Sequence, residues 1–261
     1  MFRPKLNQNC SKLKIKKILV SQPEPTTPKS PYFELAEKNN VKIDFRPFIQ
    51  VEGVDVKDFR KQKVSIPDHT AVIFTSRTAI DHFFRISEEM RLTIDDNMKY
   101  FCISEATAFY LQKYIVYRKR KIFHSTGRFT DLMEIIKKHK DEKFLVPLSD
   151  IHKQEIPDLL NKSKVNYTKA ILYKTVSSDL SDLKGIDYDM LVFFSPSGIA
   201  SLFQNFPDFQ QKDIVIASFG PATAKAVTEA GLRLDIQAPM PQAPSMTAAL
   251  DLYIKQQNGK K

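Results

Sequence analysis

The sequence contains no tryptophan, only seven glycines and only two cysteines among its 261 residues. Because glycine is scarce, few backbone positions can adopt left-handed conformations without strain, and each glycine beside a predicted turn is informative. Cys10 and Cys102 fall in a basic N-terminal stretch and in a predicted buried strand, so we expect no disulfide between them. This cysteine usage favours a reducing compartment, and we expect the protein to be cytoplasmic.

Long hydrophobic runs are also missing. No stretch approaches the roughly 18 consecutive apolar residues of a membrane-spanning helix. The basic start, MFRPKLNQNCSKLKIKK, has no apolar core of signal-peptide length. We therefore expect no membrane partner, and we interpret residues 1–15 as a basic flexible arm.

Common catalytic and cofactor motifs are absent as well. There is no P-loop, no GxGxxG turn, no nucleophile elbow and no Cys-His pair. None of the histidines has the paired spacing that is typical of metal ligands, and we interpret each as a surface or packing residue. They are His69, His82, His124, His139 and His152. The sequence thus predicts neither a metal site nor nucleotide chemistry.

Basic residues exceed acidic ones, with 40 Lys and Arg against 30 Asp and Glu, which gives a net charge of +10. Such an excess favours an acidic partner, which could be nucleic acid, a membrane surface or a polycarboxylate ligand. For any single cluster, surface lysines that keep the protein in solution are the simpler alternative. The run Arg118-Lys119-Arg120-Lys121 motivates a nucleic-acid alternative, but it is short and no recognition module accompanies it. We expect no nucleic-acid partner.

The strongest pattern is a pair of consecutive strand–turn–helix units. In the first, the apolar run Met190–Phe194 predicts a buried parallel strand, and the turn SPSG (195–198) leads into a helix. In the second, Ile214–Phe219 is followed by the turn GPAT (220–223) and another helix. Small hydroxyl residues at a helix start cap its free N–H groups, and that end of a helix attracts anions.

The same plan occurs earlier, in AVIFTSRTAIDHFF (71–84) and YFCISEATAFYL (100–111). This repetition predicts an α/β protein with two similar domains, each a parallel sheet flanked by helices. Two long extended stretches would join them as a two-stranded antiparallel connector that acts as a hinge, and we expect a monomer. The predicted parts are domain 1 (16–40 plus 178–261), an inserted domain 2 (55–164), and connecting strands (41–54 and 165–177).

Polar residues gather at the predicted helix starts. Ligand crevices in open α/β sheets lie outside the carboxyl ends of the strands, so two such crevices facing each other would form one donor-lined cleft. That lining suits a ligand with many carboxylates, although ordinary helix capping remains the alternative for any single turn. The candidate substrate-binding residues are Ser76, Arg77, Thr78, Thr107, Thr126, Arg128, Ser197, Gly198, Gly220, Ala222 and Thr223.

Several segments, in this order, resemble the uroporphyrinogen-III synthase family. They are FTSRTAIDHF, the segment ILYKT (171–175), FFSPSGIASLF, FGPATAKAVTEAGL and QAPMPQAPSMTAAL. Each motif alone is degenerate, whereas the ordered set, together with the duplicated halves and twin connectors, is fairly specific. The resemblance extends along nearly the whole chain, from Lys17 to Tyr253.

The resemblance implies a cofactor-free lyase of tetrapyrrole (heme) biosynthesis. Its substrate would be hydroxymethylbilane, a linear tetrapyrrole with acetate and propionate groups on every ring. The family removes water from this substrate, inverts the terminal pyrrole ring through a spiro intermediate and closes the macrocycle. The resemblance assigns Tyr173 the catalytic role of assisting departure of the hydroxyl, and it suggests transient contact with the upstream hydroxymethylbilane synthase. An aromatic that merely packs on an exposed strand is the alternative for Tyr173.

The chain departs from the family in the second domain. Family sequences often have glycine where this chain has Ser104-Glu105, and a glycine-containing turn where it has Ser149-Asp150. Glu105 and Asp150 would repel a carboxylate if they faced the ligand, and Arg77 and Arg128 could compensate as strong carboxylate donors. The competing hypothesis is a non-catalytic two-domain α/β module that binds a polycarboxylate, which would tolerate Tyr173→Phe.

Overall fold

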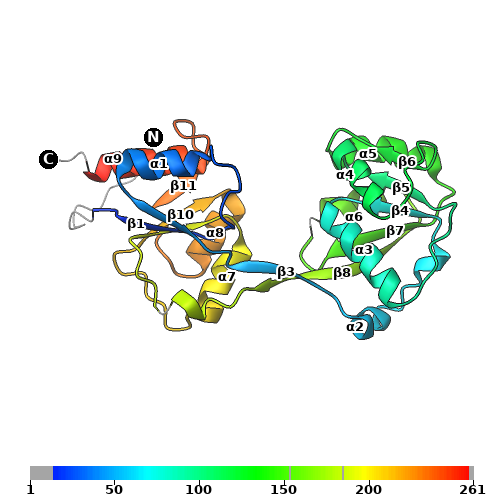
Figure 1. Cartoon of the computed structure of the whole chain (residues 1–261), viewed down its shortest axis with the longest axis horizontal. Coiled ribbons are helices and arrows are strands. Elements are labelled where there is room, and N and C mark those ends of the chain that lie inside the picture. Colours follow the sequence, from blue (N-terminus) through cyan, green and yellow to red (C-terminus); the bar gives the residue numbers. More distant parts are fainter. Residues whose placement is uncertain (1–13, 153, 184, 259–261) are drawn as a thin grey trace. The chain divides into compact units, whose positions relative to one another are not determined.

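A computed structural model describes residues 14–152, 154–183 and 185–258 of the chain (Figure 1). The chain divides into two compact units: unit 1 comprises Met1–Gln50 and Val176–Lys261, and unit 2 comprises Val51–Thr175. Unit 2 is therefore a continuous segment inserted into unit 1. Most of the predicted N-terminal arm, including Cys10, lies outside the described residues.

Unit 1 contains a five-stranded sheet in the order β11-β10-β9-β1-β2, and every neighbouring pair in it is parallel. Its strands are β1 (Lys17–Val20), β2 (Lys42–Phe45), β9 (Met190–Phe193), β10 (Val215–Phe219) and β11 (Ile236–Ala238). Its helices are α1 (Pro31–Asn39), α7 (Pro196–Asn205), α8 (Pro221–Glu229), α9 (Met246–Asn258) and the short 3₁₀ turn η4 (Ser181–Leu183).

Side chains that alternate along β1, an inner strand of the sheet, divide the core of unit 1 between the two faces of the sheet. Ile18 packs in a cluster with Leu250 of α9, whereas the next residue, Leu19, packs with Leu202 of α7 and Val227 of α8. All of these side chains are buried. Covering both faces with helices explains why the strands are continuously apolar, since each successive side chain meets a different helix layer.

Unit 2 contains a six-stranded sheet in the order β3-β8-β7-β4-β5-β6, in which the pairs from β8 to β6 are parallel. Its strands are β3 (Ile49–Gly53), β4 (Ala71–Phe74), β5 (Lys99–Cys102), β6 (Ile122–His124), β7 (Phe144–Ser149) and β8 (Tyr167–Ser177). Its helices are α2 (Val56–Lys61), α3 (Arg77–Glu89), α4 (Glu105–Tyr110), α5 (Phe129–Ile136) and α6 (Glu155–Lys162), with 3₁₀ turns η1 (Ile66–Asp68), η2 (Leu111–Lys113) and η3 (Lys137–His139).

The core of unit 2 has the same two-sided construction. On β4, Phe74 packs with Phe83 of α3, while Ile73 joins the cluster that contains Leu132 of α5 and Leu160 of α6. The predicted fold class is confirmed by this arrangement of two α/β units with parallel sheets between helices. No helix in the described part of the chain is long and apolar enough to cross a membrane.

Two predicted strands differ in the structure. The extended stretch 41–54 is two strands rather than one, because β2 pairs with β1 whereas β3 neighbours β8. The break falls around Pro47, which has no N–H to donate to a ladder. The sequence also predicts a strand over 233–238, but only its last three residues, Ile236–Ala238, are in β11.

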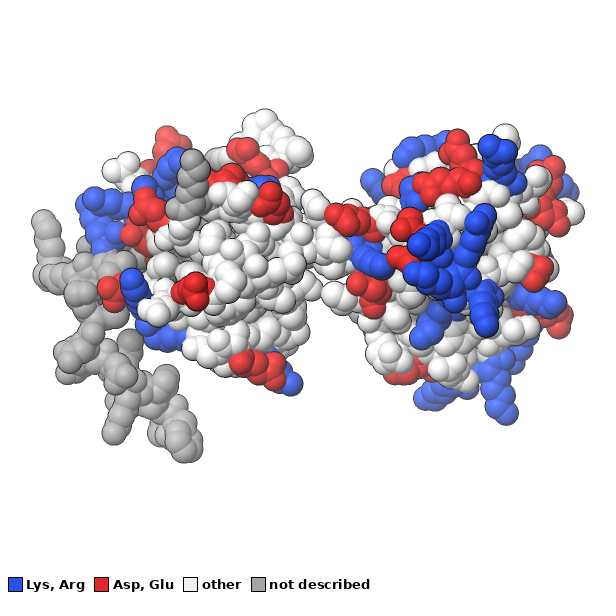
Figure 2. Space-filling model, turned by 90° about the horizontal axis from the view of Figure 1, so that it is seen from below, with Lys and Arg blue, Asp and Glu red and all other residues white. Residues whose placement is uncertain are grey.

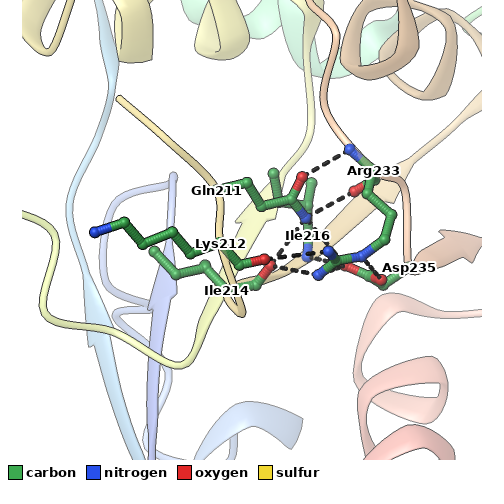
Figure 3. A network of polar contacts seen from close by, with 6 residues as sticks. All are labelled: Gln211, Lys212, Ile214, Ile216, Arg233 and Asp235. Atoms are coloured by element: carbon green, nitrogen blue, oxygen red, sulfur yellow. Dashed lines mark hydrogen bonds and ion pairs between the residues drawn. The ribbon is translucent and has the colours of Figure 1, made fainter. Parts of the chain in front are cut away.

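Side-chain hydrogen bonds explain the shortening of β11 (Figure 3). Gln211 Oε1 accepts from the backbone N–H of Arg233 at 2.6 Å, and Gln211 Nε2 donates to the carbonyls of Ile214 and Arg233, both at 2.9 Å. Asp235 accepts from the N–H of Ile216 at 2.9 Å and from Arg233 Nε at 2.7 Å. These hydrogen bonds use backbone groups of the residues just before β11 and link those residues to the segment around the start of β10.

Helix boundaries differ by smaller amounts. The prediction omitted α2, although Asp55 caps it by accepting from the N–H of Asp58 at 2.7 Å. The sequence predicts a helix over 153–163, but the helix α6 begins at Glu155, and no side chain caps it. The sequence predicts a helix over 246–256 with a frayed tail after it, whereas α9 extends to Asn258.

Candidate active site

The candidate residues of unit 2 follow the carboxyl ends of its parallel strands. Ser76 follows β4, Ser104 follows β5, and Thr126 follows β6. Tyr173 lies on β8 opposite Ser149, the last residue of β7. Because parallel strands end at a common edge, the topology brings these turns to one side of the sheet.

Tyr173 and Ser76 are brought together at this edge. The Tyr173 hydroxyl lies 3.5 Å from Ser76 Oγ, and either oxygen can be the donor. Ser76 is the N-cap of α3, and its Oγ accepts from the N–H of Ala79 at 3.0 Å. The cap holds the Ser76 side chain in place, and the Tyr173 hydroxyl lies next to this fixed oxygen. Both side chains remain partly exposed.

The ring of Tyr173 stacks on the ring of His82, from α3, with centroids 5.2 Å apart and planes 18° apart. Burial lowers the pKa of His82, and the positive charge of Arg85 lowers it further. The imidazole is therefore held neutral beside the phenol. From the sequence, His82 was interpreted as a surface or packing residue. The contact depends on the strand pairing that places β8 near α3, which the sequence alone does not show.

A second group of candidates gathers one strand further along. Ser104 and Thr126 form an isolated antiparallel bridge, and the turns around them line an open hollow of about 470 Å³. Glu105 and His124 line the same hollow. The predicted Thr107 is instead buried, with its Oγ1 3.0 Å from Ser104 Oγ, so it supports the N-cap of α4.

The two arginines and Thr78 take different positions. Arg77 is exposed at the start of α3, with its guanidinium 5.4 Å from the ring centroid of Tyr110, and Thr78 follows it on the helix. Arg128 is exposed at the N-cap of α5, where its carbonyl accepts from Ser125 Oγ at 3.2 Å. Their exposure leaves both guanidiniums able to reach an anion.

The two acidic departures from the family pattern have distinct surroundings. Asp150 is exposed, but its Oδ1 accepts from Ser149 Oγ at 2.8 Å and from the N–H groups of Ile151 at 2.8 Å and Thr175 at 3.0 Å. Burial alone would raise the pKa of Asp150, but these hydrogen bonds outweigh it and lower the pKa. Asp150 thus stabilises its own turn as a carboxylate, whereas Glu105 lines the hollow.

The candidate residues of unit 1 lie at two neighbouring helix starts. Ser195 caps α7 by accepting from the N–H of Gly198 at 3.2 Å, and Ser197 is partly exposed in the first turn. Gly198 is buried against Phe193, since a Cβ placed there would meet its Cδ1 at 3.4 Å. The neighbouring strand β10 is parallel to β9, so α8 begins at the same sheet edge.

Gly220 begins α8 with φ of 84° and ψ of 154°, a conformation that is nearly exclusive to glycine. Its N–H donates to the carbonyl of Ala238 at 2.7 Å. Ala222 is exposed in the first turn, whereas Thr223 is buried. The sequence analysis missed Ser218, whose buried Oγ has no hydrogen-bond partner in the described part of the chain. A hydroxyl left unpaired in this way is costly unless a further polar group reaches it.

Figure 2 shows Lys and Arg side chains gathered on one face of unit 2, with Asp and Glu side chains among and around them. Within residues 14–152, 154–183 and 185–258, no cluster of His, Cys, Asp or Glu could hold a metal ion. Cys102 is buried and not in a disulfide.

Comparisons with known proteins agree with one another. The profile of the family described as uroporphyrinogen-III synthase HemD matches residues 30–248. A uroporphyrinogen-III synthase of Saccharomyces cerevisiae is 27% identical over 139 residues, a match that covers 47% of this chain and only half of the yeast protein. A putative uroporphyrinogen-III synthase of Methanocaldococcus jannaschii is 27% identical over 202 residues, which cover 74% of this chain and 82% of that protein.

Among solved structures, the chain is similar in fold to the uroporphyrinogen-III synthetase of Helicobacter pylori. The TM-score is 0.58 at 17% sequence identity, and the match covers 93% of this chain and all of the other. At that identity the likeness concerns the fold.

Proposed function

Because the chain belongs to the uroporphyrinogen-III synthase family, a family of lyases that cyclise hydroxymethylbilane, we propose that it catalyses this cyclisation in heme biosynthesis. The reaction removes the hydroxyl of the hydroxymethyl group, inverts the terminal pyrrole ring and closes the macrocycle. The observation that carries the proposal is the family match over residues 30–248.

The arrangement at the sheet edge of unit 2 supports this chemistry. The pyrroles supply the electrons, so the protein must mainly fold the substrate and assist departure of one oxygen. Tyr173 is the proposed general acid, because a phenol can donate a hydrogen bond to the leaving hydroxyl. If Ser76 Oγ, at 3.5 Å, donates to the phenol oxygen, the phenol proton remains directed to substrate.

Carboxylate binding is proposed to use neutral donors and exposed guanidiniums. The helix starts of α3, α7 and α8 present free N–H groups at the carboxyl edges of their sheets. Arg77 and Arg128 are the proposed charged contacts, and they would compensate for Glu105, which lines the hollow beside the Ser104 turn.

A coupled assay tests the function. Porphobilinogen and hydroxymethylbilane synthase generate the linear tetrapyrrole with and without the protein, and the oxidised products are separated by isomer. Uncatalysed closure gives the symmetric type I product, so a shift to type III is the expected result. Persistent type I product from folded protein would contradict the proposal and favour the non-catalytic binding module.

The role of Tyr173 is tested with two matched variants of β8. Tyr173→Phe should lower kcat by roughly a hundredfold while KM changes little, because only the donated hydrogen bond is lost. Tyr167→Phe removes a hydroxyl from the same strand, one that donates to Asn161 Oδ1 at 3.0 Å, and should leave kcat unchanged. Equal effects of the two substitutions would show that Tyr173 has no special role.

Three finer features stay predictions: the cytoplasmic location, a monomer with a hinge between its units, and transient contact with hydroxymethylbilane synthase. Scattering profiles of the free and substrate-bound protein test the hinge. Two profiles that fit one rigid shape would argue against it. Isomer ratios measured at rising protein concentration test whether hydroxymethylbilane passes directly between the two enzymes. A contact between them would suppress type I product even when this protein is scarce relative to hydroxymethylbilane synthase.

A further inference from the structure

Arg85, one turn further along α3, holds the imidazole of His82 in its stack on Tyr173. Arg85 Nε donates to His82 Nδ1 at 3.2 Å. Because an arginine nitrogen can only donate, Nδ1 must be the accepting nitrogen, and a neutral imidazole then carries its proton on Nε2. The arginine therefore fixes both the plane and the tautomer of the ring against which Tyr173 packs.

Arg85 is itself fixed by contacts on its other nitrogens. Nη1 donates to Glu89 Oε1 at 2.8 Å, and Nη2 donates to the carbonyls of Val54 at 2.7 Å and Leu172 at 3.4 Å. Leu172 immediately precedes Tyr173. One guanidinium thus holds the backbone of β8 and the imidazole that lies against the next side chain.

Gly53 makes this close approach possible. A Cβ at residue 53 would lie 2.7 Å from Cζ and Nη2 of Arg85, which real contacts do not allow. The absence of a side chain at this position lets the guanidinium lie against the main chain. Glu89, Arg85 and His82 therefore form a connected series that ends at the ring of Tyr173.

We propose that His82 is a positioning residue for Tyr173: its ring, fixed by Arg85, holds the phenol in the orientation that places the hydroxyl beside Ser76. The inference rests on the proposed function and on the role of Tyr173 in it. His82 acts through the phenol and does not touch substrate. The charged groups of α3 that influence it are Arg85, Asp81 and Glu89, and the group facing it from β8 is Tyr173 itself.

A double-mutant cycle in the isomer-resolved assay tests the inference. His82→Ala should lower kcat by roughly tenfold with KM within about twofold, because the phenol loses its fixed orientation. His82→Phe keeps a flat ring against Tyr173 but loses the bond from Arg85, so it should recover only part of that rate. In the Tyr173→Phe background, His82→Ala should cost less than about twofold, since no hydroxyl is left to aim.

The control is His69→Ala, which removes a histidine of the same unit whose Nδ1 lies 2.8 Å from the carbonyl oxygen of Ser65. It should leave kcat unchanged. If His82→Ala matches this control, or if its tenfold loss persists undiminished in the Tyr173→Phe background, the inference is wrong. Either result would leave the proposed function intact, since wild-type protein would still yield the type III isomer.

A measurement that does not depend on catalysis separates the positioning role of His82 from the proposed function. In protein labelled with ¹³C-tyrosine, the ring signal of Tyr173 is assigned by its loss in Tyr173→Phe. His82→Ala should shift this signal by removing the ring current of the imidazole, and His82→Phe should keep it displaced from the position in His82→Ala. An unmoved signal would overturn the stack, whatever the assay shows.

Discussion

The side-chain amide of Gln62 forms a matched pair of hydrogen bonds with the backbone of Ile171, two residues before Tyr173. Nε2 donates to the carbonyl at 2.8 Å, and Oε1 accepts from the N–H at 2.9 Å. Beside it, the N–H of Val54 donates to the carbonyl of Leu172 at 2.9 Å. Gln62 thus provides hydrogen bonds to the backbone of β8 beyond the end of the neighbouring strand β3.

Replacing this amide should destabilise unit 2. Gln62→Leu leaves both backbone groups of Ile171 unpaired, and we expect a loss of about 1–3 kcal/mol in the free energy of unfolding, measured by urea denaturation. Gln154→Leu is the control, because Gln154 is exposed and its side chain donates to Asp158 of the helix that it precedes. That change should stay within about 0.5 kcal/mol. Equal losses would show that the pairing of Gln62 contributes nothing specific.

Gly220 and Gly198 should respond differently to alanine. At Gly220 a side chain would meet no atom within 4 Å, but φ of 84° strains any L-residue, so Gly220→Ala should cost about 1–3 kcal/mol. Gly198 lies inside α7, where alanine is the better helix former, and Gly198→Ala should be neutral to within about 1 kcal/mol. Thermal unfolding monitored by circular dichroism compares them. A harmless Gly220→Ala would rule out strain at this turn.

The network around Gln211 should affect stability without affecting catalysis, because it lies at the amino end of β10. Gln211→Leu removes the side-chain oxygen that accepts from the Arg233 N–H and the side-chain nitrogen that donates to the carbonyls of Ile214 and Arg233, and we expect a loss of roughly 3 kcal/mol. The adjacent Gln210 is exposed, and Gln210→Leu is the matched control. The loss is read from the urea midpoint. A drop in kcat at a temperature where Gln211→Leu is fully folded would contradict this assignment.

Asp251 should make the stability of unit 1 depend on acid pH. The ion pair with Lys255, followed by contacts from Asn39 and Lys38, lowers the pKa of this carboxyl from 3.8 to about 2. A lowered folded pKa gives stability that is complete above the unfolded value and is lost as the pH falls from about 4 toward 2. Since the group is partly exposed, the contribution is about 1–1.5 kcal/mol rather than the full shift.

Asp251→Asn tests this expectation through its difference from wild type in the free energy of unfolding. The difference should be constant between pH 8 and pH 5 and should shrink below about pH 4. Asp208→Asn, at an exposed residue of the same unit, is the control and should show no such trend. A difference that grows toward acid pH would have the wrong sign.

The sequence was sufficient for the fold class because the patterns involved are local. Apolar runs such as that of β9 and N-caps such as Ser76, Ser104 and Ser195 depend on neighbouring residues, and all three serines cap helices as expected. What the sequence could not provide were the effects of distant partners. The bonds of Gln211 to the residues just before β11, where the expected strand fails to begin, come from a segment about 22 residues away.

The candidate site shows the same limit. Ser76 and Tyr173 were both named from the resemblance and from helix-start chemistry, but their 3.5 Å approach depends on strand order. In the sequence, nothing distinguished His82 from an ordinary packing residue of a helix. Its stack on Tyr173 depends on the same strand order. Thr107 had the residue type of a ligand contact, yet burial directs its hydroxyl to Ser104.

The insertion of unit 2 into unit 1 has a consequence for synthesis on the ribosome. Unit 2 is one continuous segment, so it can fold once Thr175 has left the exit tunnel. Strand β1 must wait for its neighbour β9, which is made only after the whole of unit 2. During that interval the edge of β1 that pairs with β9 has no partner strand, and slow translation through residues 176–219 would prolong this incompletely folded stage of unit 1.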